Sequence, residues 1–214
     1  MRFGRDEIFD IAVQATGLIA SLVGWGFILG RAVESGRAAP VVATLAYGAT
    51  LVAMFTFSLL NSVVRDPRHQ PLVRMIDHSA IYCLIAGTYT PVCLLMLSDR
   101  QGAWMMLIMW LAAFSGILLK VALRRRAQHA LITLYVLMGW AGLFQIWTIA
   151  AKLSTGALIL LILGGIIYTA AAPLHRLTKL RYHSAIWHGC VLAAAACHYG
   201  MVLSILNQAA ISLT

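Results

Sequence analysis

The chain has 214 residues, of which 61% are hydrophobic and only 11% are charged, and its formal net charge is +9. So few charged residues cannot cover the surface of a soluble domain of this length, and the mean hydropathy of +0.85 indicates that lipid is the surrounding solvent. The basic residues are scattered along the chain instead of forming one patch, so binding of a nucleic acid is not expected.

Long stretches without Asp, Glu, Lys or Arg follow one another along almost the whole chain. A transmembrane helix needs about 20 consecutive apolar residues, and each stretch can hold one. The strict apolar and polar alternation of β-barrel strands is absent. The sequence therefore predicts an all-α integral membrane bundle that forms a single domain over residues 1–214. Its seven transmembrane helices are expected at about 10–30, 39–64, 78–98, 101–122, 129–151, 154–174 and 183–207.

The basic residues predict the orientation of this bundle. Twelve of the 16 lysine and arginine residues lie at the N-terminus or in the connections after the second, fourth and sixth helices. The opposite side carries only Arg31, Arg37, Arg100 and Lys152. Basic residues in short loops stay in the cytoplasm. We therefore expect a multi-pass protein of the bacterial cytoplasmic (inner) membrane, with a cytoplasmic N-terminus, a periplasmic C-terminus and membrane lipids as its surroundings.

Several polar side chains lie at helix ends that share the cytoplasmic side in this topology. The second helix ends with Ser58 and Ser62 on one face, the third begins near Asp77, and the seventh begins with Ser184 and His188, one turn apart. Polar groups in lipid need a partner or a function. We expect these five side chains to converge in one pocket about one helical turn below the cytoplasmic surface.

Structural roles are the alternative for the same residues. Serines in membrane helices often bond the carbonyl four residues earlier or help helices pack, and a single His such as His188 is often a hydrogen-bonded packing residue. Asp77 can pair with Arg74 and cap its helix. His198 lies on the same face as Ser184 and His188, about 15 Å deeper in the membrane. The four cysteines form no C-x-x-C pair, so no thiolate zinc site is indicated.

Two segments resemble the signatures of a known family. Residues 77–91 (DHSAIYCLIAGTYTP) resemble the signature of the hemolysin III family, which belongs with the progestin and adiponectin Q receptors. Residues 185–188 (AIWH) and 197–199 (CHY) resemble its seventh-helix signature, and 139–140 and 164–168 match weaker positions. The resemblance covers almost the whole chain without a large insertion. It implies seven helices and a cytoplasmic N-terminus, in agreement with the distribution of basic residues.

The resemblance also implies a zinc site near the cytoplasmic side. The family ligands are a His that closes an S-x-x-x-H motif on helix two and two His in H-x-x-x-H on helix seven, while an Asp on helix three acts through a metal-bound water. Here these motifs read Ser58-x-x-x-Ser62 and Ser184-x-x-x-His188. His188 is thus the one remaining metal ligand, Ser62 and Ser184 occupy former ligand positions, and Asp77 and Ser58 remain as candidate catalytic residues.

The substituted ligands make bound zinc improbable, although the family would allow it. Catalytic zinc usually has three protein ligands and one open position, and a family His on helix one, in D-x-x-x-H, is also replaced, because this sequence has Gln14 after Asp10. His78 and His183 flank the site and are the only local substitutes. His183 lies about 100° from Ser184 around the helix, so it is expected to point elsewhere.

Four functions follow from these residues. The substituted ligands favour a metal-poor member that binds a lipid ligand or has a membrane-homeostasis or sensing role. A zinc-dependent, ceramidase-like hydrolase of a lipid amide or ester is the alternative, with Asp77 positioning the water. Permeabilisation of other membranes, the activity in the family name, has no amphipathic pore-forming segment to support it. A triad of Ser62 or Ser184 with His188 and Asp77 lacks a visible oxyanion hole.

Overall fold

The computed structural model describes residues 4–97, 99–123, 128–174 and 181–211, and every regular element within these ranges is helical. The all-α prediction is therefore confirmed. In chain order the elements are α1 (Arg5–Glu34), α2 (Ala38–Val63), α3 (Gln70–Leu95), α4 (Asp99–Leu123), α5 (Gln128–Trp140), the 3₁₀-helix η1 (Ala141–Gln145), α6 (Ile146–Lys152), α7 (Thr155–Ala171) and α8 (His183–Ile211).

Six helical stretches within the described residues are long and apolar enough to cross a membrane: α1, α2, α3, α4, the stretch Thr133–Lys152 and α8. α7 is also apolar but has only 17 residues, or about 26 Å at 1.5 Å per residue. This matches the lower limit for a spanning helix. Of the residues that predicted the orientation, Arg2, Arg124, Arg125, Arg126, Arg176 and Lys179 lie outside the described part of the chain.

α3 begins earlier than predicted. It starts at Gln70 instead of residue 78, and a proline occupies its first turn, where the missing N–H is harmless. The segment before residue 78 contains Arg74 and Asp77, so it lies outside the uncharged stretch on which the predicted start of the helix depends. As a consequence, Asp77 lies in the third turn of α3, and its predicted role as a helix cap is wrong.

The helix predicted at 129–151 is interrupted by η1, and Tyr89 of α3 accounts for the interruption. Its hydroxyl donates a hydrogen bond to the carbonyl oxygen of Gly139 (2.8 Å) and accepts one from the N–H of Gly142 (2.8 Å). A side chain inserted into the i to i−4 ladder is a known cause of helix kinks, and glycine weakens a helix locally. Tyr89 thus satisfies the backbone groups that the break between α5 and α6 releases.

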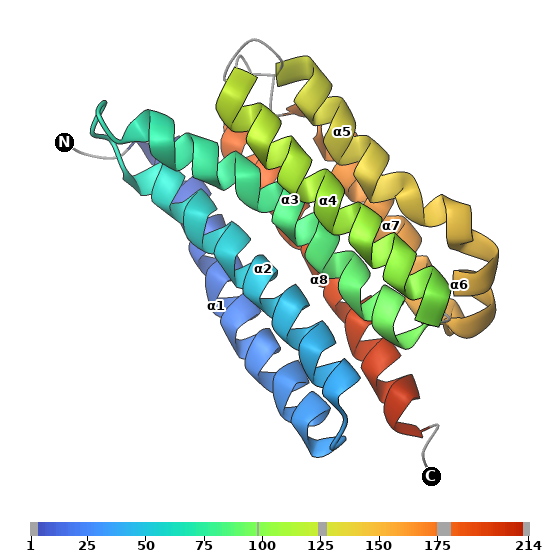
Figure 1. Cartoon of the computed structure of the whole chain (residues 1–214). Coiled ribbons are helices and arrows are strands. Elements are labelled where there is room, and N and C mark those ends of the chain that lie inside the picture. The colour runs from blue at the N-terminus through green and yellow to red at the C-terminus, as the bar shows by residue number, and fades with distance from the viewer. Residues whose placement is uncertain (1–3, 98, 124–127, 175–180, 212–214) are drawn as a thin grey trace.

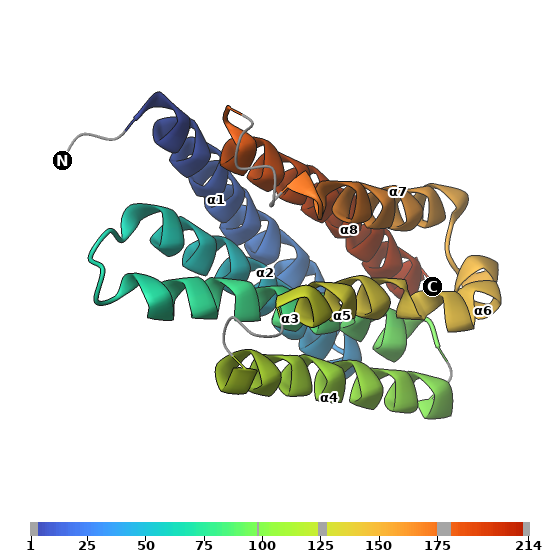
Figure 2. The ribbon, with the colours of Figure 1, turned by 90° about the horizontal axis from the view of Figure 1, so that it is seen from above.

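The helices run roughly along one common direction (Figure 1). α1 packs against α2 and α8, α3 packs between α2 and α4, and α7 packs against α8. α5 contacts α3, α4 and α7 less extensively, and Figure 2 shows α4 on the outer side of α3. The bundle is therefore tight around α1, α2, α3 and α8, and looser where α5 meets α7.

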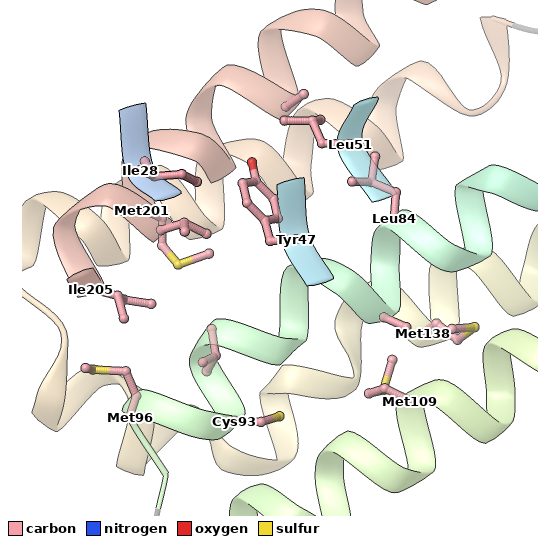
Figure 3. Packing of buried hydrophobic residues seen from close by; sticks show 14 of the residues in the cluster. Ile28, Tyr47, Leu51, Leu84, Cys93, Met96, Met109, Met138, Met201 and Ile205 are labelled. Carbon is pink, nitrogen blue, oxygen red and sulfur yellow. The ribbon is translucent and has the colours of Figure 1, made fainter. Parts of the chain in front are cut away.

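Large apolar side chains fill the tight part of the bundle. Ile28 of α1, Tyr47 of α2 and Met201 of α8 are almost completely buried and lie close together, while Met109 of α4 and Met138 of α5 meet at a second point (Figure 3). Such interiors have close-packed density, and this packing holds the helix ends that form the site in register.

The approach of α1 to α2 depends on a glycine. A Cβ atom at Gly48 would overlap the indole ring of Trp25, so we expect Gly48→Ala to lower the free energy of unfolding by about 1–3 kcal/mol, the usual cost of overpacking. Gly26→Ala is the matched control, because its Cβ would meet nothing within 4 Å. Thermal unfolding in detergent measures both variants, and equal melting temperatures would show that the contact is not tight.

Candidate functional site

A cavity of about 1370 Å³ lies between the helices. Its walls are mainly apolar side chains of α3, α5, α7 and α8, and polar side chains gather at the end where α2 stops and α3 and α8 begin. Ligand pockets for small molecules usually have about 300–1,000 Å³, so this cavity has room for a long acyl chain. It is lined by all five side chains predicted to converge: Ser58, Ser62, Asp77, Ser184 and His188.

His188 is the centre of the polar end and uses both ring nitrogens. Its Nδ1 lies 2.6 Å from Oδ1 of Asp10, and its Nε2 lies 3.2 Å from Oγ of Ser58. An ionised carboxylate only accepts hydrogen bonds, so Nδ1 carries the proton and donates it to Asp10. In the neutral ring Nε2 is then an acceptor, and the single hydrogen of the Ser58 hydroxyl has two acceptors within reach, Nε2 of His188 and the carboxylate of Asp77.

The second carboxylate oxygen of Asp10 is held by α1 and α2. Oδ2 accepts hydrogen bonds from Nε2 of Gln14 (2.9 Å) and from Oγ of Ser62 (2.8 Å). The same Gln14 amide also donates to Oγ of Ser62 (2.6 Å), and Ser184 is a further hydrogen-bond partner of Asp10. Asp10 and Gln14 are one turn apart and only 6% and 0% exposed. The helices thus enclose a buried carboxylate whose partners are donors.

Asp77 belongs to a neighbouring set of contacts. Its Oδ2 accepts a hydrogen bond from Nδ2 of Asn61 (2.8 Å), and it also hydrogen-bonds Ser58. Gln70, at the start of α3, donates to the backbone oxygen of Asn61 (3.2 Å). Ser58 therefore stands between the Asp10–His188 pair and the Asp77–Asn61 pair, and it connects the two parts of the site.

The structure changes the predicted partnerships within the pocket. The proposed triad placed Ser62 or Ser184 and Asp77 around His188, but Ser62 and Ser184 bond Asp10, and the serine facing Nε2 is Ser58. Helical phase indicates which residues share a face. It does not indicate which neighbour on another helix each one meets.

Three further histidines lie around the same cavity. His183 lines it, contrary to the prediction that it points elsewhere. His78 also lines it and lies 2.8 Å from Nζ of Lys120 through Nδ1. His198 lines the deep part, with Nε2 at 3.4 Å from the carbonyl oxygen of Leu161. These rings hold separate partners at different heights and do not replace the missing ligands around His188.

The residues present do not fit a zinc ion of the usual kind. Catalytic zinc needs about three protein ligands, and in the described part of the chain no group of three or more His, Cys, Asp and Glu side chains is arranged to hold a metal. Both nitrogens of His188 face other protein groups, and serine hydroxyls occupy the former ligand positions Ser62 and Ser184. The low zinc affinity expected from the sequence stays a prediction.

Sequence reasoning missed Asp10 and Gln14 as parts of the site. Both were seen only as a family motif that had lost its His. A signal was present, because they are two polar residues one turn apart in an otherwise apolar helix, and polar groups at such positions face the bundle interior. Asn61 was missed for a similar reason, since it occupies one of the unspecified positions inside the Ser58-x-x-x-Ser62 motif.

Comparisons with known proteins place this geometry among relatives. A family model described as "Haemolysin-III related" matches residues 5–199. Hemolysin-3 of Bacillus cereus is 34% identical over 202 residues, which cover 94% of this chain and 92% of that protein. The Hemolysin-3 homolog of Bacillus subtilis (strain 168) is 31% identical over 199 residues, which cover 93% of each chain. The matched lengths include α1 and the start of α8, so the similarity extends over the helices that form the polar site.

Proposed function

Because this chain belongs to the hemolysin III family, we propose that it is a seven-helix protein of the inner membrane whose cavity binds an acyl lipid without a bound zinc ion. The family resemblance recognised at residues 77–91 and 185–199 is confirmed, and the chain is a membrane protein with several apolar helices. The lipid ligand, the count of seven spans, the orientation and the absence of zinc are the proposal.

The charges and helix lengths support the topology. In the sequence, twelve of 16 basic residues lie at the N-terminus or in and beside the connections after α2, α4 and α7, as expected for cytoplasmic loops. α7 is apolar over its 17 residues. Counted with the six longer stretches, it brings the number of spans in the proposed topology to seven. The polar end of the cavity then lies near the cytoplasmic surface, and the apolar part reaches toward the middle of the bilayer.

The cavity is the observation that supports the function. It joins apolar walls, formed by residues such as Leu84, Ile85 and Val191, to one polar end with Ser58 and His188. An amphiphile with one long chain matches this division, because its chain meets apolar walls like those of the surrounding hydrocarbon while its head group meets hydrogen-bonding side chains. A polar metabolite does not match the cavity, because most of its polar groups would face apolar walls that offer no hydrogen bonds.

Photocrosslinking with a diazirine-bearing fatty acid tests the binding. We expect crosslinks on the cavity walls, and we expect Ile85→Trp to reduce crosslinking at least tenfold, because the indole fills part of the cavity that Ile85 lines. The matched control is Ile108→Trp, since Ile108 is 58% exposed on the outer side of α4 and does not line the cavity.

Binding is measured on the purified full-length protein in detergent, with competition by unlabelled fatty acid. The proposal is wrong if both tryptophan variants crosslink as strongly as the wild type and unlabelled fatty acid does not compete. The acyl chain of the probe would then reach only the outer surface of the bundle. Melting temperatures of the two variants show whether Ile85→Trp still folds.

A further inference from the structure

Three side chains from three helices form a directed chain of hydrogen bonds in the membrane. Asp10 of α1 lies 2.6 Å from Nδ1 of His188 of α8, and Nε2 of His188 lies 3.2 Å from Oγ of Ser58 of α2. The carboxylate fixes the tautomer with the proton on Nδ1, so Nε2 faces the serine as a base. This is the order of roles in serine hydrolases, which are recognised by geometry and not by sequence position.

We propose that Ser58 is a nucleophile that accepts the acyl group of a long-chain fatty-acyl ester, with His188 as its general base and no metal ion required. The proposal rests on the lipid binding proposed above, because the ester must lie in the cavity that Ser58 lines. It assigns Ser58 and His188 as catalytic residues and Asp10 as the positioning residue of His188.

The reaction has two balanced steps. Oγ of Ser58 forms a bond to the ester carbonyl carbon, its proton moves to Nε2 of His188, and the carbon–oxygen bond to the alcohol breaks as His188 returns the proton to the leaving oxygen. A water molecule then attacks the acyl-serine and gives its proton to Nε2. The carboxylic acid leaves, and Ser58 recovers its hydroxyl.

The neighbouring serines cannot take this role in the observed geometry. The hydroxyl of Ser62 donates to Oδ2 of Asp10 and receives a hydrogen bond from Gln14, and Ser184 is also a partner of Asp10. Both therefore act on the carboxylate side of His188, where they help to hold Asp10. Only Ser58, among the described serines, is hydrogen-bonded to Nε2.

Asn61 indicates which acyl compounds suit the site. Its side chain lines the cavity one turn after Ser58, and Nδ2 donates one of its two hydrogens to Asp77. The second hydrogen is the donor that we assign to the carbonyl oxygen, since side-chain amides serve in oxyanion holes. One neutral donor stabilises less charge than a metal ion, so esters are expected to react, whereas amides, with their poorer leaving groups, are not.

Covalent labelling with a dodecyl fluorophosphonate tests the nucleophile. Ser58 should attack phosphorus, release fluoride and leave the full-length protein heavier by one alkyl phosphonate. We expect one adduct per chain, mapped to Ser58 by peptide mass spectrometry, and none in Ser58→Ala. Ser79→Ala is the matched control, because that hydroxyl only donates to the carbonyl oxygen of Met75, and its labelling should equal that of the wild type.

The kinetics of labelling separate the relay from folding. In His188→Gln and Asp10→Asn the maximal labelling rate should fall at least about 100-fold, since loss of the base or of its tautomer has large effects in such relays, while the half-saturating probe concentration stays unchanged. If His188 and Asp10 had only a structural role, the variants would also change the half-saturating probe concentration or would fail to fold.

The outcomes are distinct from those of the lipid-binding experiment. Fatty-acid crosslinking without an adduct on Ser58 would overturn the nucleophile and leave the binding proposal standing. An adduct that forms equally in His188→Gln would also overturn the relay, because Ser58 would then react without its base. If neither crosslinking nor labelling occurs in the folded protein, the lipid-binding proposal fails first, and the relay fails with it.

Discussion

Replacement of Asp10 by alanine is expected to lower the free energy of unfolding by about 2–6 kcal/mol, because two buried donors lose the acceptor that they share. The variant would leave the Nδ1–H of His188 and the hydroxyl of Ser62 without the carboxylate that they face at 2.6 and 2.8 Å. Buried donors without an acceptor cost about 1–3 kcal/mol each.

Two further substitutions in α1 are the controls for this result. Asp10→Asn keeps an acceptor oxygen in the same place, so we expect a smaller loss than in Asp10→Ala. Asp6→Ala removes an exposed carboxylate one turn earlier and should change stability by less than about 1 kcal/mol. Titration with sodium dodecyl sulfate in mixed micelles measures all three. Equal losses for Asp10→Ala and Asp6→Ala would mean that the network around Asp10 contributes no stability.

A gain of zinc is expected when the two former ligand positions are restored. Ser62 and Ser184 both contact Asp10, which itself contacts His188. Imidazoles at both positions therefore join His188 in one cluster, and three His ligands hold catalytic zinc in proteins. Elemental mass spectrometry of the purified protein should find about one zinc per chain in the double variant Ser62→His, Ser184→His, and only traces in the wild type.

The single variants Ser62→His and Ser184→His are the controls, because two imidazoles should bind zinc more weakly and lose it on dialysis against a chelator. About one tightly held zinc per wild-type chain would contradict both the metal-free site and the relay through His188, since a coordinating nitrogen cannot also accept the proton of Ser58. Zinc in neither the wild type nor the double variant would show that the new imidazoles do not converge.

Hydropathy and charge predicted more of the fold than of the site. The apolar stretches predicted an all-helical chain and the approximate positions of its long helices, because each stretch must satisfy its own backbone in lipid. They misplaced the start of α3, because this helix begins at Gln70, before the uncharged stretch, and includes charged residues in its first turns. They also missed the break after Trp140, which depends on the hydroxyl of Tyr89 from another helix.

For the site, the sequence predicted which residues share a pocket but not which side chains on different helices contact each other. Helical phase and topology predicted that Ser58 and His188 line one pocket, and the structure places them 3.2 Å apart. The alternative of a serine triad paired His188 with Asp77. Asp10 is its partner instead, and this pairing depends on the packing of α1 against α8, which a pattern within one helix does not contain.

The short helix α7 affects the bilayer around the protein. Its 17 residues span about 26 Å, whereas α1, with 30 residues, spans about 45 Å, and a hydrocarbon layer is about 30 Å thick. The longer helices adapt to such hydrophobic mismatch by tilting, and a short one adapts by drawing the lipid interfaces together. In the proposed seven-span topology, the bilayer is therefore expected to be thinnest beside α7, one of the walls of the cavity. Lipid in that thinned annulus would have its head groups closest to the level of the buried polar site.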